Sequence, residues 1–165
     1  MDDLDGKPAK PAGPFAAYEE ALRSADAGAR TKAAYELGMT GDKNAAPLLM
    51  AALGDKDLNV GAAAALAITR VDASGQLEVL RNSLTAESSD TRGNSALALG
   101  FARDKESLDP MLVALAKEND VDAGKRIVRA LGELGQKAAI PGLQAAANSN
   151  PELKETVDAA VAKLK

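Results

Sequence analysis

The stretch that decides the fold runs from residue 129 to residue 143 and reads RALGELGQKAAIPGL. It holds an alanine and leucine segment that ends in Leu131-Gly132, a short polar break, and a second apolar segment around Pro141. Apolar residues three or four positions apart, such as Ile140 and Leu143, form one stripe along a helix. The stretch therefore predicts two helices joined by a tight turn.

The first segment of this stretch recurs along the chain at a nearly constant interval. The copies are residues 34–38, 64–67, 97–100, 129–132 and 160–162. Their last residues are separated by 29, 33, 32 and 30 positions. A period of roughly 30 to 45 residues is typical of solenoids built from helix pairs. We therefore expect an all-α fold, an α-solenoid of about five stacked antiparallel helix pairs.

The same period divides the chain into a leader and one repeat domain. Residues 1–14 combine acidic residues with three prolines and two glycines, which predicts a flexible leader. The repeat domain is expected to span residues 15–165. It opens with a capping helix at residues 15–23, in which Phe15, Tyr18 and Leu22 face inward. The expected repeats are residues 25–54, 57–85, 90–118, 122–148 and a partial repeat, 150–165.

Acidic residues predict where several first helices begin. Asp57, Asp90 and Asp122 each stand ten residues before the end of a recurring segment. A carboxylate at a helix start accepts hydrogen bonds from free backbone N–H groups and favours the positive end of the helix dipole. These three residues are therefore predicted N-caps. In the last repeat, Asn150 and Pro151 form a similar helix start.

Polar breaks predict the turns within the helix pairs. Gly41 and Gly135 stand where a left-handed backbone conformation would end the first helix most easily. Arg70 and Arg103 occupy the equivalent positions in the second and third repeats. We expect these two turns to close in a different way.

These motifs resemble HEAT repeats, in particular the short HEAT-like type named after phycobilisome lyases. That type shows an acidic start, a Val-Arg pair, an alanine-rich stretch ending in Leu-Gly, and then Ala-x-Pro-x-Leu. The matches are Ala29-Arg30, Thr91-Arg92 and Leu153-Lys154 for the pair, Leu37-Gly38, Leu99-Gly100 and Leu131-Gly132 for the anchor, and residues 45–49 and 139–143 for the last motif. The resemblance covers about residues 25–165 and implies a HEAT-like superhelix.

Composition argues against catalysis and cofactors. The chain has no histidine and no cysteine, which removes the side chains most often used for zinc, haem, thiol nucleophiles and acid–base work near neutral pH. Glu118, Asp120 and Asp122 form an acidic cluster, but it lacks the glycine turn and the distal glutamate of a calcium loop. We therefore expect no enzyme activity, no catalytic residues, no cofactor and no metal.

The basic residues form no tract of the kind that nucleic acids require. The formal net charge is −4, and the densest basic group is Lys125, Arg126 and Arg129. Lys125 and Arg129 lie four positions apart, so they share one helix face. That face could hold an acidic partner, although a solvated convex face is the commoner explanation for such a group.

We predict a non-catalytic protein–protein interaction scaffold or adaptor. The second helix of each pair is expected to line the concave surface and to present its outward residues to a protein partner. The predicted binding residues are Leu48, Glu78, Asn82, Asp109, Lys117, Gln144 and Asn148.

Two other functions stay open at this point. Because the repeat type is named after proteins that attach or detach bilins, a bilin-lyase-like or chromophore-handling subunit is the alternative. A nucleic-acid-binding helical repeat is a more remote alternative, because few platforms for base stacking are expected from the four aromatics, mostly at core-like positions. These four are Phe15, Tyr18, Tyr35 and Phe101.

The remaining expectations concern the partner, the compartment and the oligomeric state. We expect a protein partner, no nucleic acid, no membrane insertion and a monomer. The leader has no apolar core of the kind found in secretory signals, which favours the cytoplasm. The periplasm is the alternative if a signal peptide has been removed.

Overall fold

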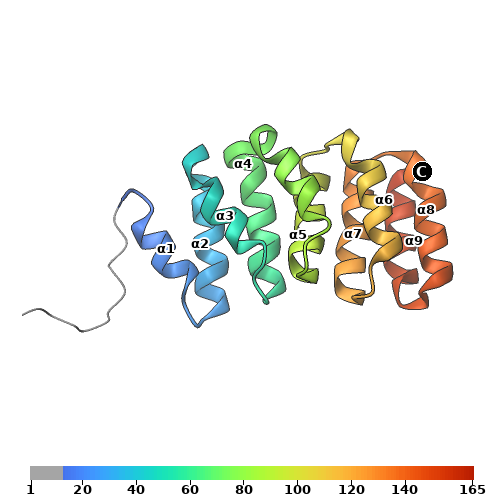
Figure 1. The fold of residues 1–165 in the computed structure, drawn as a ribbon, viewed down its shortest axis with the longest axis horizontal. Coiled ribbons are helices and arrows are strands. Elements are labelled where there is room, and N and C mark those ends of the chain that lie inside the picture. Colours follow the sequence, from blue (N-terminus) through green and yellow to red (C-terminus); the bar gives the residue numbers. More distant parts are fainter. Residues whose placement is uncertain (1–12) are drawn as a thin grey trace, which may run out of the picture.

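The computed structural model describes residues 13–165, and this part of the chain folds into nine α-helices with no strand (Figure 1). The expected all-α solenoid is confirmed. The expected leader, residues 1–14, falls almost wholly outside the described residues. The helices are α1 (Ala16–Leu22), α2 (Ala27–Met39), α3 (Ala46–Ala52), α4 (Leu58–Ser83), α5 (Ser89–Phe101), α6 (Leu108–Lys117), α7 (Val121–Leu134), α8 (Ile140–Ser149) and α9 (Lys154–Leu164).

Side-chain caps fix the starts of the first helices, but two of the three predicted caps are wrong. Asp57 caps α4 as expected, accepting a hydrogen bond from the backbone N–H of Asn59 at 2.9 Å. Ser88 caps α5 and Asp120 caps α7 instead of the predicted residues. Both helices begin two residues earlier than expected, so Asp90 and Asp122 lie inside the first turn.

The turns within the helix pairs have two kinds of backbone conformation. Gly41 and Gly135 adopt the predicted left-handed conformation, with φ of 63° and 77°. Arg103 adopts it as well, with φ of 53°, although a side chain disfavours this region. The second repeat has no turn at Arg70, because helical structure continues to Asp72, where φ is −162° and ψ is 60° and the chain passes from one half of α4 to the other.

The helices form two layers that differ in spacing. The first-helix layer consists of α2, the N-terminal half of α4, α5, α7 and α9; the second-helix layer consists of α3, the C-terminal half of α4, α6 and α8. A Cβ atom on Gly100 would lie only 2.6 Å from the backbone oxygen of Ala130, and one on Gly38 only 2.8 Å from the Cα of Ala67. The first-helix layer therefore packs at backbone contact.

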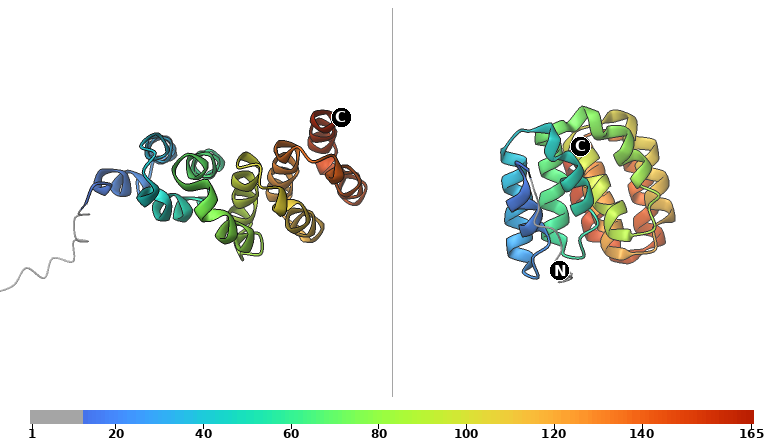
Figure 2. Two further views of the ribbon diagram at one scale, coloured as in Figure 1. Left: turned by 90° about the horizontal axis from the view of Figure 1, so that it is seen from above. Right: turned by 60° about the vertical axis from the view of Figure 1, so that its left-hand side comes forward.

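This close packing bends the stack toward the first-helix layer. Seen from above, the first helices follow the inner side of the curve and the second helices follow the outer side (Figure 2, left). The expectation that second helices line the concave side is therefore wrong. The physical reason is that the layer with the shorter helix spacing must lie inside the curve, and glycine and alanine give the first helices that spacing.

Two ion pairs join the layers within a repeat. Arg92 of α5 binds Glu118, which follows α6, through two nitrogen–oxygen contacts of 2.7 Å, and it also donates to the carbonyls of Ala86 and Glu87. Burial raises the pKa of Glu118, but hydrogen bonds from Arg92 and from two backbone N–H groups outweigh this effect, so its pKa lies below the usual value.

The first repeat contains an ion pair of the same kind. Arg30 of α2 binds Asp55, which follows α3, at 2.7 and 2.9 Å, and donates to the carbonyls of Ser24 and Ala25. The hydrogen bond from Arg30 lowers the pKa of the Asp55 carboxyl. We call these two pairs the layer-joining bridges. They hold the end of the second helix against the start of the first.

Single helices stand at both ends of the described stack. At the N-terminal end, Phe15, Tyr18 and Leu22 of the α1 region are partly buried against the core. At the C-terminal end, α9 buries Val157 and Leu164. No helix in residues 13–165 is long and apolar enough to cross a membrane.

Candidate functional site

The concave side of the stack carries two adjoining hollows. One, of about 750 Å³, lies among α2, α4 and the end of α5; the other, of about 530 Å³, lies among α5, α7 and α9. Ala62 and Phe101 line both hollows. The two therefore form one surface, which we call the concave groove. Its main residues are Thr31, Tyr35, Ala62, Leu66, Leu97, Phe101, Lys125, Arg129, Thr156 and Lys163.

The N-terminal half of the groove is mainly apolar. Leu66 and the neighbouring alanines of α4 lie beside Tyr35, whose side chain is 49% exposed. The guanidinium of Arg70 stands 5.4 Å from the centre of the Tyr35 ring, which fits a cation–π contact. Phe101 is 37% exposed at the junction of the two halves. The four aromatics were expected mostly at core-like positions; Phe15 and Tyr18 are partly buried against the core, whereas Tyr35 and Phe101 are exposed.

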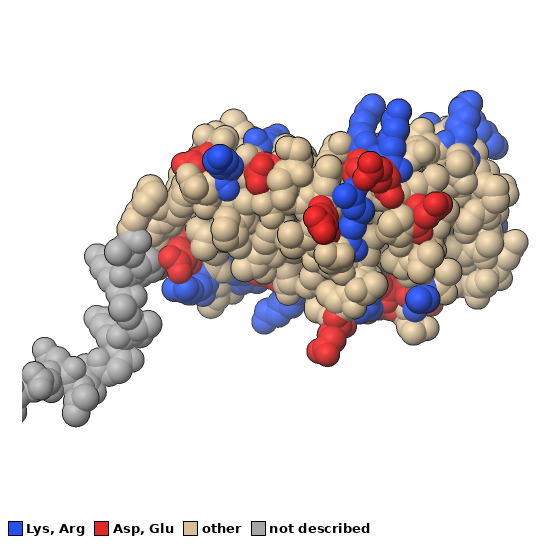
Figure 3. Space-filling model, turned by 45° about the horizontal axis from the view of Figure 1, so that its top comes forward, with Lys and Arg blue, Asp and Glu red and all other residues tan. Residues whose placement is uncertain are grey.

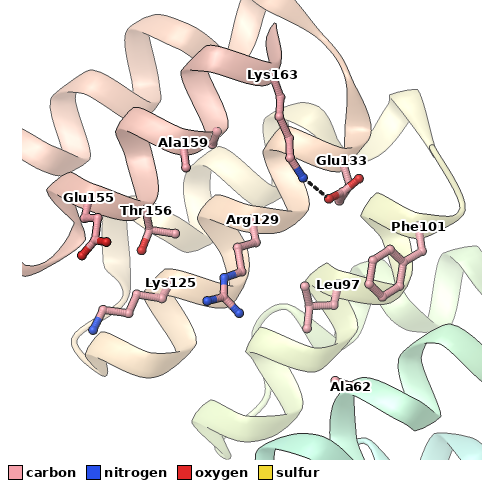
Figure 4. Close-up of a pocket in the computed structure, with 11 residues that line it drawn as sticks. Ala62, Leu97, Phe101, Lys125, Arg129, Glu133, Glu155, Thr156, Ala159 and Lys163 are labelled. Atoms are coloured by element: carbon pink, nitrogen blue, oxygen red, sulfur yellow. Dashed lines mark hydrogen bonds and ion pairs between the residues drawn. The ribbon is translucent and has the colours of Figure 1, made fainter.

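The C-terminal half of the groove is charged. Lys125, Arg129 and Glu133 follow one another at intervals of one helix turn along α7, and Lys163 reaches across from α9 to pair with Glu133 (Figure 4). The side chain of Arg129 lies between Lys125 and Leu97. Lys125 and Arg129 share one face, as predicted from their spacing.

The third member of the predicted basic group has a different place. Arg126 is only 3% exposed and binds Asp90 of α5 at 2.9 Å, with Asn94 3.4 Å away. Its guanidinium passes over Gly93, where a Cβ atom would lie 2.6 Å from the Arg126 Nε. Arg126 therefore joins two neighbouring first helices and does not reach the groove.

The acidic cluster also has structural roles. Glu118 holds Arg92, and Asp120 accepts a hydrogen bond from the backbone N–H of Ala123 at 2.8 Å as the cap of α7. Asp122 is exposed in the first turn. Within residues 13–165, no group of three or more acidic side chains is arranged to hold a metal ion.

The seven residues predicted to bind a partner all lie in the second-helix layer. Six are exposed and Leu48 is half-buried. None of them lines the concave groove. Figure 3 shows acidic and basic groups interspersed with uncharged surface on this side of the stack. Partner binding at these seven residues stays a prediction. They are Leu48 on α3, Glu78 and Asn82 on α4, Asp109 and Lys117 on α6, and Gln144 and Asn148 on α8.

Sequence reasoning missed the groove because it assigned the concave side to the wrong helices. A usable signal was present: glycine stands at three of the five recurring segment ends, where it costs up to about 1 kcal/mol in a helix relative to alanine. Such a cost indicates close backbone contact, and close contact indicates the inner layer of a curved stack.

Comparisons with known proteins agree with this architecture. A model of HEAT repeats matches residues 16–100 and 77–164. The solved complex of CpcE and CpcF of phycocyanin lyase from Nostoc sp. PCC7120 is similar over 100% of this chain and 70% of that chain, with 21% sequence identity and a TM-score of 0.61.

A second solved structure is more distant. Human deoxyhypusine hydroxylase in complex with glycerol is similar over 93% of this chain and 85% of that chain, with 16% identity and a TM-score of 0.42, which supports no argument. No curated protein matches the sequence. The first structural similarity, at 21% identity, shows a shared fold.

Proposed function

Because the chain belongs to the HEAT-repeat family, we propose that it is a non-catalytic scaffold that binds a segment of another protein in the concave groove. The observation that carries this proposal is the continuity of the groove, since Ala62 and Phe101 belong to both hollows. Exposed aromatic side chains act as anchors at many protein interfaces, and Tyr35 and Phe101 offer two of them here.

The shape of the groove favours an elongated partner. It crosses five first helices in succession, and repeat folds use such extended concave surfaces for binding. A helix or an extended segment of a partner would contact apolar residues at one end and charged residues at the other. The chain is expected to act as a monomer, in the cytoplasm or, if a signal peptide has been removed, in the periplasm.

The second-helix layer is the competing surface. The seven residues predicted from the sequence face outward there, and a partner could bind on that side without touching the groove. A useful experiment must therefore report on both surfaces at once.

Site-specific photo-crosslinking meets this need. A photoreactive amino acid placed at Ala62 reports on the groove, and the same amino acid at Asn82 reports on the second-helix layer. We expect a defined protein to be captured in the source cells from Ala62 and not from Asn82. Capture from Asn82 alone would favour the sequence-based surface, and capture from neither position would contradict a scaffold role.

A bilin-lyase-like or chromophore-handling subunit is the second candidate. The similarity to the phycocyanin lyase complex favours it at the level of the fold alone. Such a subunit would retain a coloured tetrapyrrole, so the visible absorbance of the purified protein, before and after incubation with free bilin, distinguishes the two candidates. Visible absorbance that co-elutes with the protein in gel filtration would favour the chromophore-handling subunit over the scaffold.

A further inference from the structure

The C-terminal half of the groove contains two cations without a counter-ion. Among residues 13–165, Arg30, Arg81, Arg92 and Arg126 each bind a carboxylate within 2.9 Å. No carboxylate of the described residues lies within 4.0 Å of Lys125 or Arg129. Both side chains face the hollow, and Figure 4 shows no ion pair at either.

The surrounding acids do not cancel these charges. Glu133 is already paired with Lys163, which leaves Glu155 as the remaining carboxylate that lines the hollow. The hollow therefore has a local excess of positive charge on a chain whose formal net charge is −4. A local field of this kind attracts negatively charged groups and repels positive ones.

An apolar wall stands next to the two cations. Leu97 and Phe101 of α5 face Arg129 across the hollow, and Ala159 of α9 lies on the far side (Figure 4). A guanidinium binds a carboxylate through two parallel hydrogen bonds, and an adjacent apolar side chain of the same ligand would be covered by this wall.

We infer that this half of the groove binds an acidic segment of a partner protein. Carboxylates of the segment meet Lys125 and Arg129, and a neighbouring apolar side chain packs against Leu97 and Phe101. The inference rests on the proposed function, because it names the chemistry of the partner for the same groove. Nucleic acid fits less well, because phosphate binding needs a tract of basic residues and this hollow offers only two unpaired cations among the described residues.

Labelled peptides test this inference by fluorescence anisotropy. The probe peptide consists of repeated Glu-Leu-Leu-Glu units, and the two comparison peptides consist of Lys-Leu-Leu-Lys and Glu-Ser-Ser-Glu units. We expect the first peptide to bind at least about tenfold more tightly than either of the others, with binding that weakens as salt is added. A labelled single-stranded DNA is titrated in parallel.

The variant Lys125→Glu/Arg129→Glu should abolish this preference. Its matched control, Lys43→Glu/Lys56→Glu, makes the same change of charge at two exposed residues outside both candidate surfaces and should bind like the wild type. If the control loses binding to the same extent, a general charge effect explains the result and the inference is overturned. Tighter binding of DNA than of the acidic peptide also overturns it.

Failure of the inference and failure of the proposed function give different results. Equal binding of the Glu-Leu-Leu-Glu and Lys-Leu-Leu-Lys peptides, lost for both in Phe101→Ser, overturns the acidic preference and leaves the groove as a protein-binding site. Binding that is unchanged by Phe101→Ser and by Lys125→Glu/Arg129→Glu, together with no crosslinked protein from Ala62, overturns both.

Discussion

The first-helix layer and the second-helix layer contain the same small residues but use them differently. Gly100 in α5 faces the backbone of Ala130, whereas Gly142 in α8 faces the tip of the Leu112 side chain, 2.6 Å from where its Cβ would stand. A backbone cannot move aside, but the end of a leucine can. We therefore expect glycine to set the curvature only where it meets backbone.

Breaking a bridge between the layers should have the largest effect. Arg92→Met leaves Glu118, whose side chain is only 2% exposed, without its partner. We expect the free energy of unfolding to fall by about 2 to 3 kcal/mol in urea titrations, because a desolvated carboxylate loses charged hydrogen bonds. The control Lys154→Met breaks an exposed pair with Asp158 and should cost less than about 0.5 kcal/mol. Equal losses would show that the bridge contributes no more than a surface pair.

Filling the space at the glycines compares the layers directly. Gly100→Ala should lower the free energy of unfolding by about 2 kcal/mol, because overpacking against backbone outweighs the gain in helix propensity. Gly142→Ala should change it by less than about 0.5 kcal/mol, because the tip of Leu112 can rotate away. Thermal and urea unfolding of both variants measure this. A smaller loss at Gly100 than at Gly142 would contradict the assignment of the inner layer.

The pH dependence of stability should report on the layer-joining bridges. The pKa values of Glu118 and Asp55 are lowered in the folded state, so their contribution is fully present above the usual carboxyl range and is lost as the pH falls through the folded-state values. We expect the free energy of unfolding to decline below about pH 4. The variant Glu118→Gln should be less stable near neutral pH and show a weaker decline. An unchanged slope in this variant would exclude Glu118 as a source of the pH dependence.

The smallest effect on stability is expected in the groove. Lys125 and Arg129 have no ion pair with the rest of the described chain, so Lys125→Glu/Arg129→Glu should change the free energy of unfolding by less than about 0.5 kcal/mol. Circular dichroism during urea unfolding checks this. A loss as large as that of Arg92→Met would mean that the groove charges stabilise the fold.

Local patterns in the sequence were enough to predict the helix pairs. The recurring segments and the glycines at 41 and 135 depend on neighbouring residues alone, and the structure has helices and left-handed turns at these places. The caps at Asp90 and Asp122 were wrong because Ser88 and Asp120 were equally good candidates two residues earlier. Propensity could not choose between them.

The groove could not be predicted in the same way. Exposure of Tyr35 and Phe101 depends on which layer lies inside the curve, and this depends on contacts between residues about 30 positions apart, such as Gly100 with Ala130. The buried position of Arg126 could not be predicted for the same reason, because its partner Asp90 belongs to the previous repeat. Charge and spacing alone counted it in one basic group with Lys125 and Arg129.

The kinked helix α4 gives the stack an uneven stiffness. In a solenoid, small rotations between neighbouring helices add up along the chain, so the two ends can move like the ends of a spring. The two halves of α4 meet at Asp72, whose φ of −162° and ψ of 60° are non-helical, without a loop between them. Such a short connection leaves less slack than the turns at Gly41, Arg103 and Gly135, so we expect bending to concentrate on either side of α4. The groove would then open or narrow mainly at its two ends, while its centre at Ala62 keeps a constant width.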